Sequence, residues 1–242
     1  MPSATDFHNA TSFGPHHQVS ARDHDGARVA LPVVHPASVD PRVGARFSCR
    51  TFAEHPLALD HLAMMLANAY GKLGPASTNG IEFEHRTVPS AGARYPLELF
   101  VLARDVEGVD PGCYRYSVDT HDLQIGAQRP DDAVLATIFL DQPYVASVPA
   151  IVMIAARVAL TTEKYGSRGY RYVLIEAGHV GQNLVLSAAG LGVGALPIGG
   201  FLDGELAALL GNDPVANPPL YGVALGYPVS QDVAVSRSIP ND

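Results

Sequence analysis

The stretch YVLIEAGHVGQNLVLSAAGL, residues 172–191, is the strongest structural signal in the chain. Its hydrophobic residues recur at steps of three and four, the spacing of one helix face, and Gly192 follows as a stop. Further hydrophobic residues fall between those steps, so the predicted helix is apolar nearly all round. Such a helix is buried in a core or against a partner subunit.

The sequence on both sides of this helix alternates between predicted strands and predicted helices. Strands are predicted at 97–103, 113–117, 123–125, 149–156 and 220–227, and further helices at 57–71, 131–140 and 203–210. The run at 149–156 is continuously apolar and predicts a strand buried on both faces, whereas residues 72–80 predict a loop. Asp203 is placed to cap the last helix. This interleaving predicts an α/β or α+β fold in one domain, residues 41–242.

Residues 1–40 differ from this domain, because they hold five of the ten histidines and no periodic apolar pattern. The interpretations are a metal-binding segment or a flexible N-terminal arm. The arm is favoured, since no histidine pair has helical spacing within a helix-like pattern.

Composition narrows the class of protein. The 242 residues are 47% hydrophobic and carry a net charge of −8 without a run of Lys or Arg, which excludes a nucleic-acid binder. The longest apolar stretch falls short of the roughly 20 residues that span a bilayer, and no signal peptide is visible. Two cysteines make neither a disulfide framework nor a zinc site. We therefore expect a soluble cytoplasmic protein without a structural metal.

Four short segments carry potential chemistry. Arg46, Ser48 and Arg50 alternate in RFSCR, so in an extended chain they face one side, as an anion site requires. The small residues of PSAGARYP, 89–96, allow a flat ligand to approach the backbone. The alternative interpretation of RFSCR is a pair of exposed arginines, and that of PSAGARYP is a tight turn.

The glycines of PIGGF, 197–201, offer backbone N–H donors, or simply form a turn. Lys164 and Tyr165 place two proton-transfer groups side by side in EKYG, 163–166, which otherwise reads as a solvated polar loop.

The four segments occur together, in the order in which they follow one another along this chain, in one known family. The chain resembles the SagB/ThcOx-type dehydrogenases, the azoline-oxidising branch of the FMN-dependent nitroreductase superfamily, to which McbC-like microcin synthase subunits belong. The resemblance is carried by RFSCRTF (46–52), VPSAGARYPLELFV (88–101), VDPGCYRY (109–116), KYGSRGYRYVLIEAGHVGQNL (164–184), GLGVGALPIGGF (190–201) and PLYGVALGYP (219–228).

The resemblance implies a nitroreductase-like fold, with a central mixed or antiparallel sheet flanked by helices, and an interlocked homodimer with FMN at its interface. It makes Lys164 and Tyr165 the catalytic pair, without deciding which is the base. The implied FMN contacts are Arg46, Ser48, Arg50, Ser90, Ala91, Gly92, Arg94, Pro197, Ile198, Gly199, Gly200 and Arg237.

The implied activity is oxidation of thiazoline or oxazoline rings, in a peptide-derived or carrier-bound natural product, to thiazole or oxazole, with O₂ reoxidising the flavin. Other biosynthetic enzymes are expected as partners. Two alternatives keep FMN: desaturation of another small or peptide substrate, and NAD(P)H-dependent reduction of nitro compounds or quinones. A non-catalytic scaffold subunit is the third hypothesis, and the intact motifs argue against it.

Overall fold

The computed structural model describes residues 30–32, 35 and 38–229. Most of the predicted arm, 1–40, and the predicted FMN contact Arg237 therefore lie outside the described residues. Helix α2 (Pro41–Ala45) begins where the predicted domain begins, because the Asp40 carboxylate caps it by accepting a 2.9 Å hydrogen bond from the Arg42 N–H.

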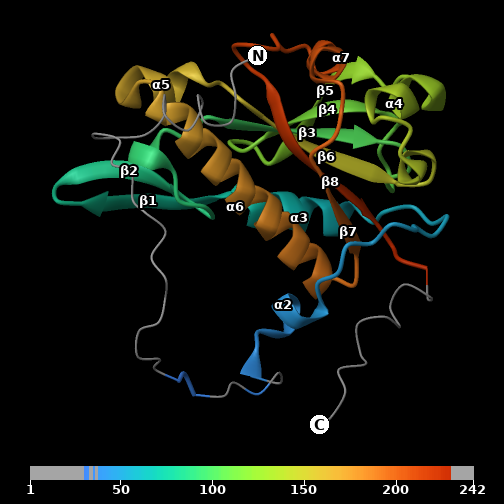
Figure 1. Cartoon of the computed structure of the whole chain (residues 1–242), viewed down its shortest axis with the longest axis horizontal. Helices are drawn as coiled ribbons and strands as arrows, with labels where there is room; N and C mark the ends of the chain where they lie inside the picture. Colours follow the sequence, from blue (N-terminus) through green and yellow to red (C-terminus); the bar gives the residue numbers. More distant parts are fainter. Residues whose placement is uncertain (1–29, 33–34, 36–37, 230–242) are drawn as a thin grey trace, which may run out of the picture.

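A six-stranded antiparallel sheet forms the centre of the molecule, in the order β5-β4-β3-β6-β8-β7 (Figure 1). Its strands are β3 (Leu97–Ala103), β4 (Gly112–Ser117), β5 (Asp122–Gln128), β6 (Ala150–Ala156), β7 (Gly194–Ile198) and β8 (Pro219–Gly226). The five strands predicted from the sequence are confirmed, and β7 adds the edge that leads into Gly199 and Gly200. The predicted mixed α/β fold with a flanked central sheet is confirmed.

Helices cover both faces of this sheet. Helices α3 (Leu59–Tyr70) and α6 (Arg168–Gly190) cover one face, and α4 (Asp132–Ile138) and α7 (Asp203–Leu209) cover the other. Alternate side chains of β6 enter the two cores, and all seven of its residues are buried. This confirms the strand predicted to be buried on both faces.

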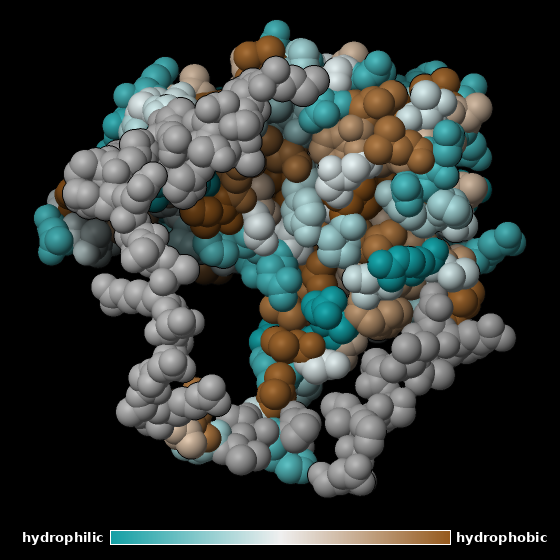
Figure 2. Space-filling view, in the orientation of Figure 1, coloured by the Kyte–Doolittle hydropathy of each residue, from teal (hydrophilic) through white to brown (hydrophobic). Residues whose placement is uncertain are grey.

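Helix α6 begins four residues before its predicted start and crosses the sheet at close range. A methyl group built on Gly181 would lie 2.3 Å from a ring carbon of Tyr221 on β8, so only glycine permits this approach. The opposite side of the helix is uncovered, with Leu174 38% and Ile175 50% exposed. Figure 2 shows hydrophobic residues interrupting the polar surface on the side along which α6 runs. No helix among the described residues is both long and apolar enough to span a membrane.

Two local predictions outside the candidate site were wrong. Residues 72–80, predicted as a loop, form most of a hairpin of β1 (Lys72–Thr78) and β2 (Ile81–Arg86). Its turn is Asn79-Gly80, with φ of 51° and 76°, the dipeptide that two-residue hairpin turns favour. Asp203 makes no capping hydrogen bond, because Leu202 is the N-cap and Asp203 lies in the first turn of α7.

Candidate active site

The RFSCR segment follows α2 in an extended conformation along the edge strand β7. Ser48 forms a parallel bridge with Ala195, and the Cys49 N–H donates a 3.0 Å hydrogen bond to the Ala195 carbonyl. Cys49 is fully buried, while Arg46 and Arg50 are exposed. Both arginine side chains therefore lie at the surface.

Arg50 lines a cavity of about 380 Å³ together with the predicted segment Pro197–Gly200. Nothing lies within 4 Å of a methyl group built on Gly199, so the backbone here is open to a ligand. Tyr144, from the short helix η3 (Pro143–Ala146), also lines the cavity. Burial raises the pKa of Tyr144 to about 12, so its hydroxyl stays protonated at neutral pH and can donate a hydrogen bond.

Arg46 lines a different, smaller cavity of about 160 Å³. That cavity is bounded by Val185 and Ala189, which belong to the C-terminal part of α6. The two arginines of RFSCR therefore serve neighbouring but separate openings.

The loop from Ser90 to Tyr95 forms a tight, strained turn around η2 (Ala91–Ala93). Gly92, Ala93 and Tyr95 all have positive φ, of 62°, 54° and 46°. The Ser90 Oγ accepts a 2.8 Å hydrogen bond from the Tyr95 N–H, which closes the turn. The side-chain-bearing residues Ala93 and Tyr95 persist at positive φ only where surrounding contacts hold them, and such strain is common at functional sites.

Lys164 and Tyr165 form the last turn of α5 (Ala159–Tyr165), so the polar loop predicted at 163–166 is wrong. The Lys164 Nζ lies 5.2 Å from the centroid of the Tyr165 ring. The Tyr165 ring packs edge-on against Tyr172 of α6, with centroids 5.2 Å apart.

The structure brings this pair to the Ser90–Tyr95 loop. A methyl group built on Gly92 would lie 2.5 Å from Tyr165 Oη and 2.7 Å from Lys164 Nζ. Both proton-transfer groups therefore meet at the backbone of one glycine. Two segments that are far apart in the chain form a single cluster.

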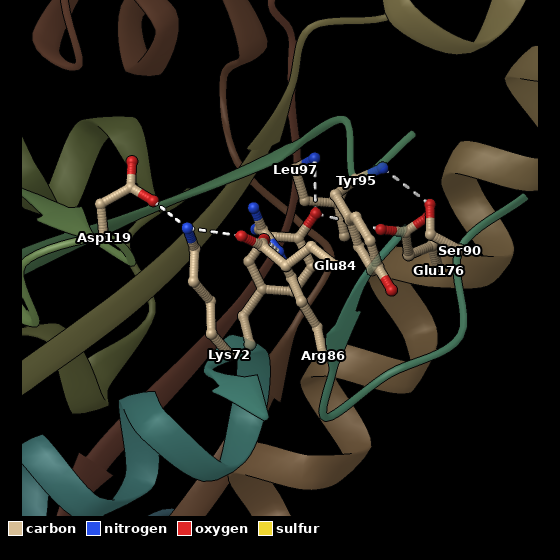
Figure 3. Close-up of polar contacts among 9 residues, drawn as sticks. Lys72, Glu84, Arg86, Ser90, Tyr95, Leu97, Asp119 and Glu176 are labelled. Atoms are coloured by element: carbon tan, nitrogen blue, oxygen red, sulfur yellow. Dashed lines mark hydrogen bonds and ion pairs between the residues drawn. The ribbon is translucent and has the colours of Figure 1, made fainter. Parts of the chain in front are cut away.

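Sequence analysis missed Glu176, a carboxyl group that is 3% exposed on the covered face of α6. Its Oε1 accepts a 3.0 Å hydrogen bond from Tyr70 Oη (Figure 3), and an interaction with the Ser90 side chain lowers its pKa. Burial raises the pKa of Glu176 to about 7. The signal was present, because Glu176 falls three residues after Val173 and four before Val180, on the buried stripe of the helix.

A charged cluster borders this network. The Arg86 guanidinium lies over the rings of Tyr70 and Tyr95, 4.8 and 4.6 Å from their centroids. Glu84 pairs with Arg86 at 2.7 Å and with Lys72 at 2.5 Å (Figure 3). These contacts attach the β1–β2 hairpin to the Ser90–Tyr95 loop.

The predicted site residues thus fall into two clusters within one chain. Lys164, Tyr165 and Gly92 lie beside the N-terminal end of α6, whereas Arg46 lies beside its C-terminal part. Figure 1 shows α5 and α2 at opposite ends of α6, a helix of 23 residues and therefore about 34 Å.

The fold and these clusters define the class of protein: the chain belongs to the nitroreductase family, whose family model matches residues 43–227. The protein MJ1384 of Methanocaldococcus jannaschii, whose name places it among the nitroreductases, is 38% identical over 186 residues, covering 77% of this chain and 90% of that protein. The microcin B17-processing protein McbC of Escherichia coli is 28% identical over 177 residues, covering 69% of this chain and 61% of McbC.

Two solved structures share the fold. A chain of the E. coli microcin synthetase McbBCD complex with truncated pro-MccB17 bound superposes with a TM-score of 0.70 at 21% identity, covering 93% of this chain and 87% of that chain. A nitroreductase-family structure from Desulfovibrio desulfuricans in complex with FMN superposes with a TM-score of 0.54 at 18% identity, covering 85% of this chain and 93% of that chain. The two solved structures thus share the fold of this nitroreductase-family chain.

Proposed function

We propose that the protein is an FMN-dependent oxidase that converts a thiazoline or oxazoline ring of a peptide-derived natural product into a thiazole or oxazole. The observation that carries this proposal is the contact of Lys164 and Tyr165 with the backbone of Gly92. Simple electron transfer from flavin to a nitro group needs no such pair, whereas azoline oxidation requires removal of a ring proton. Similarity to McbC supports the same branch of the family.

The residues present fit an FMN group. Arg50 offers a guanidinium at the edge of a cavity of about 380 Å³, and the open backbone of Gly199 and Gly200 leaves room for a flat ring. Charge-assisted hydrogen bonds from arginine suit a phosphate or the polar ring edge. In this proposal the FMN contacts are those that the resemblance implies, within the domain 41–242.

Bound FMN would supply the acceptor for the two electrons that leave the ring as a hydride, with O₂ as the final oxidant. The chain supplies the base that takes the ring proton made acidic by the neighbouring C=N and carbonyl groups. Lys164 and Tyr165 lie side by side, so one side chain accepts the proton while the other orients the accepting group. Because Gly92 lacks a side chain, both polar ends can approach the same point of the Ser90–Tyr95 loop.

We further propose that the active unit is a homodimer. The pair Lys164–Tyr165 and the guanidinium of Arg46 lie at opposite ends of α6, so one chain does not gather them around one flavin. A two-fold axis can place one cluster of each chain against the other cluster of its partner. The exposed side chains of Leu174 and Ile175 would be covered by the same association.

A second candidate function is NAD(P)H-dependent reduction of nitro compounds or quinones, which the likeness to MJ1384 favours. In that case FMN would be reduced by a nicotinamide, and Lys164 and Tyr165 would have no chemical task. If the protein instead desaturates another peptide substrate, Lys164 and Tyr165 would still remove a proton, and only the group that is oxidised would differ from an azoline ring.

The test is anaerobic bleaching of the flavin by a synthetic peptide that carries one thiazoline. Lys164→Ala and Tyr165→Phe should each slow bleaching about 10²–10⁴-fold while they retain the flavin spectrum. Lys72→Ala is the matched control, because Lys72 is the only other lysine in the chain, and Tyr114→Phe is the control for the hydroxyl. Parent-like bleaching in both variants, with unchanged NAD(P)H oxidation, would overturn the proposal in favour of the reductase.

A further inference from the structure

A buried carboxylate connects the two ends of the Ser90–Tyr95 loop. The hydroxyl of Ser90, where the loop begins, interacts with the Glu176 carboxyl and opposes the rise that burial causes in its pKa. On its other side Glu176 accepts the hydrogen bond from Tyr70 Oη, and that oxygen accepts a 3.1 Å hydrogen bond from the N–H of Leu97, the first residue of β3. Figure 3 shows the contacts of Tyr70 with Glu176 and Leu97, and the contact of Ser90 with Tyr95 beside them.

The hydroxyl of Ser90 has two partners within this network. It accepts a hydrogen bond from the N–H of Tyr95, which closes the turn, and it interacts with the carboxyl of Glu176 on α6. Ser90 therefore holds the loop in shape through its side chain. The positive φ angles of Gly92, Ala93 and Tyr95 need such external support.

We propose that Glu176 is a positioning residue that, through Ser90 and Tyr70, holds the loop in the conformation that places Gly92 against Lys164 and Tyr165. The effect of this placement on the rate of substrate oxidation rests on the proposed function. The placement itself does not, because it concerns contacts among residues of this chain.

The surroundings of Glu176 make the loop sensitive to pH. The groups that face it are Tyr70 from α3, Arg86 from β2 and Tyr95 from the loop, and Arg86 is itself paired with Glu84. Burial favours the neutral carboxyl, and opening of the loop would expose it to water and favour the ionised form. Protonation of Glu176 therefore stabilises the closed loop, and a rise in pH through about 7 favours opening.

Hydrogen–deuterium exchange of the Tyr95 and Leu97 amides, corrected for intrinsic rates, measures this closure in the flavin-loaded protein without any substrate. Glu176→Ala should accelerate exchange of both amides roughly tenfold or more, since each loses a chain of hydrogen bonds. Ser90→Ala should do the same at Leu97, although Leu97 does not contact Ser90 directly.

Two further variants separate positioning from general destabilisation. Ser187→Ala removes another hydrogen bond between α6 and α3, the 2.9 Å contact with Asn68, and should leave both amides within about twofold of the parent. Glu176→Gln keeps an acceptor for Ser90 but cannot ionise. It should match the parent at pH 6 and lack the severalfold acceleration that the parent shows at pH 8.

The proposal is overturned if the Tyr95 and Leu97 amides of Ser90→Ala and Glu176→Gln exchange at the same rates as those of Ser187→Ala at both pH values. This comparison does not require that Glu176→Ala folds. Flavin bleaching in the same variants should slow in parallel with loop opening, at an unchanged flavin spectrum. If a thiazoline peptide never bleaches the flavin of the parent protein, but the amide exchange rates are as expected, the proposed function alone is refuted. A parent that bleaches, with exchange unaltered in the variants, refutes the role of Glu176 alone.

Discussion

Replacement of Gly92 by alanine tests the geometry of the candidate site at its tightest point. The new methyl group would lie 2.5 Å from Tyr165 Oη and 2.7 Å from Lys164 Nζ. Carbon and a polar atom reach their optimal separation near 3.5 Å, so both polar ends must retreat by about 1 Å. Both are the far ends of flexible side chains, and the fold can absorb the shift.

A displacement of about 1 Å at reacting groups lowers a rate by about 100-fold. Gly92→Ala also places an alanine at a φ of 62°, which costs about 1–2 kcal/mol of stability. The two effects are separated by Gly108→Ala, because Gly108 has a φ of 70° and no atom within 4 Å of the added methyl group. The two variants should therefore lose similar free energies of unfolding in urea.

Stopped-flow bleaching of the flavin by a thiazoline peptide, under anaerobic conditions, isolates the step in which the substrate is oxidised. Gly92→Ala should bleach about 100-fold more slowly than the parent, and Gly108→Ala at the parent rate. If both variants bleach at the parent rate, the contact of Gly92 with Lys164 and Tyr165 has no part in catalysis. If both slow equally, backbone strain accounts for the loss.

Three other outcomes are expected. Arg50→Ala should lose flavin faster on dilution, because it removes a charge-assisted contact that contributes about 1.5–3 kcal/mol, and equal retention by fluorescence would argue against the FMN site at this cavity. Glu176 has a pKa of about 7 in the folded chain against an ordinary value of 4.5, so its contribution to stability is complete below pH 4.5 and lost as pH rises through 7. That loss is at most about 3 kcal/mol, and urea unfolding at pH 5 and pH 8 should show it in the parent and not in Glu176→Gln. Light scattering should give a dimer for the parent and a smaller particle for Ile175→Arg, since a charge on the uncovered face of α6 opposes burial; an unchanged mass would place the interface elsewhere.

The local pattern of the sequence was sufficient for most of the secondary structure. The spacing of hydrophobic residues identified five strands of the central sheet and the helices α3 and α6, since burial on one or both faces determines that spacing. The dipeptide Asn79-Gly80 also indicates a hairpin turn, but the surrounding glycine, proline and serine favour a loop. Glu176 was likewise visible as one acidic residue on an otherwise apolar stripe.

Contacts between side chains from distant parts of the chain depend on the tertiary structure. Spacing along the sequence says nothing of the approach of Gly92 to Lys164 and Tyr165, because that approach depends on how α5 and the Ser90–Tyr95 loop dock at one end of α6. The same packing separates Arg46 from this pair by the length of a helix and ties Glu176 to Ser90 and Tyr70. Local sequence encodes which residues are buried, whereas the fold determines which buried and exposed groups become neighbours.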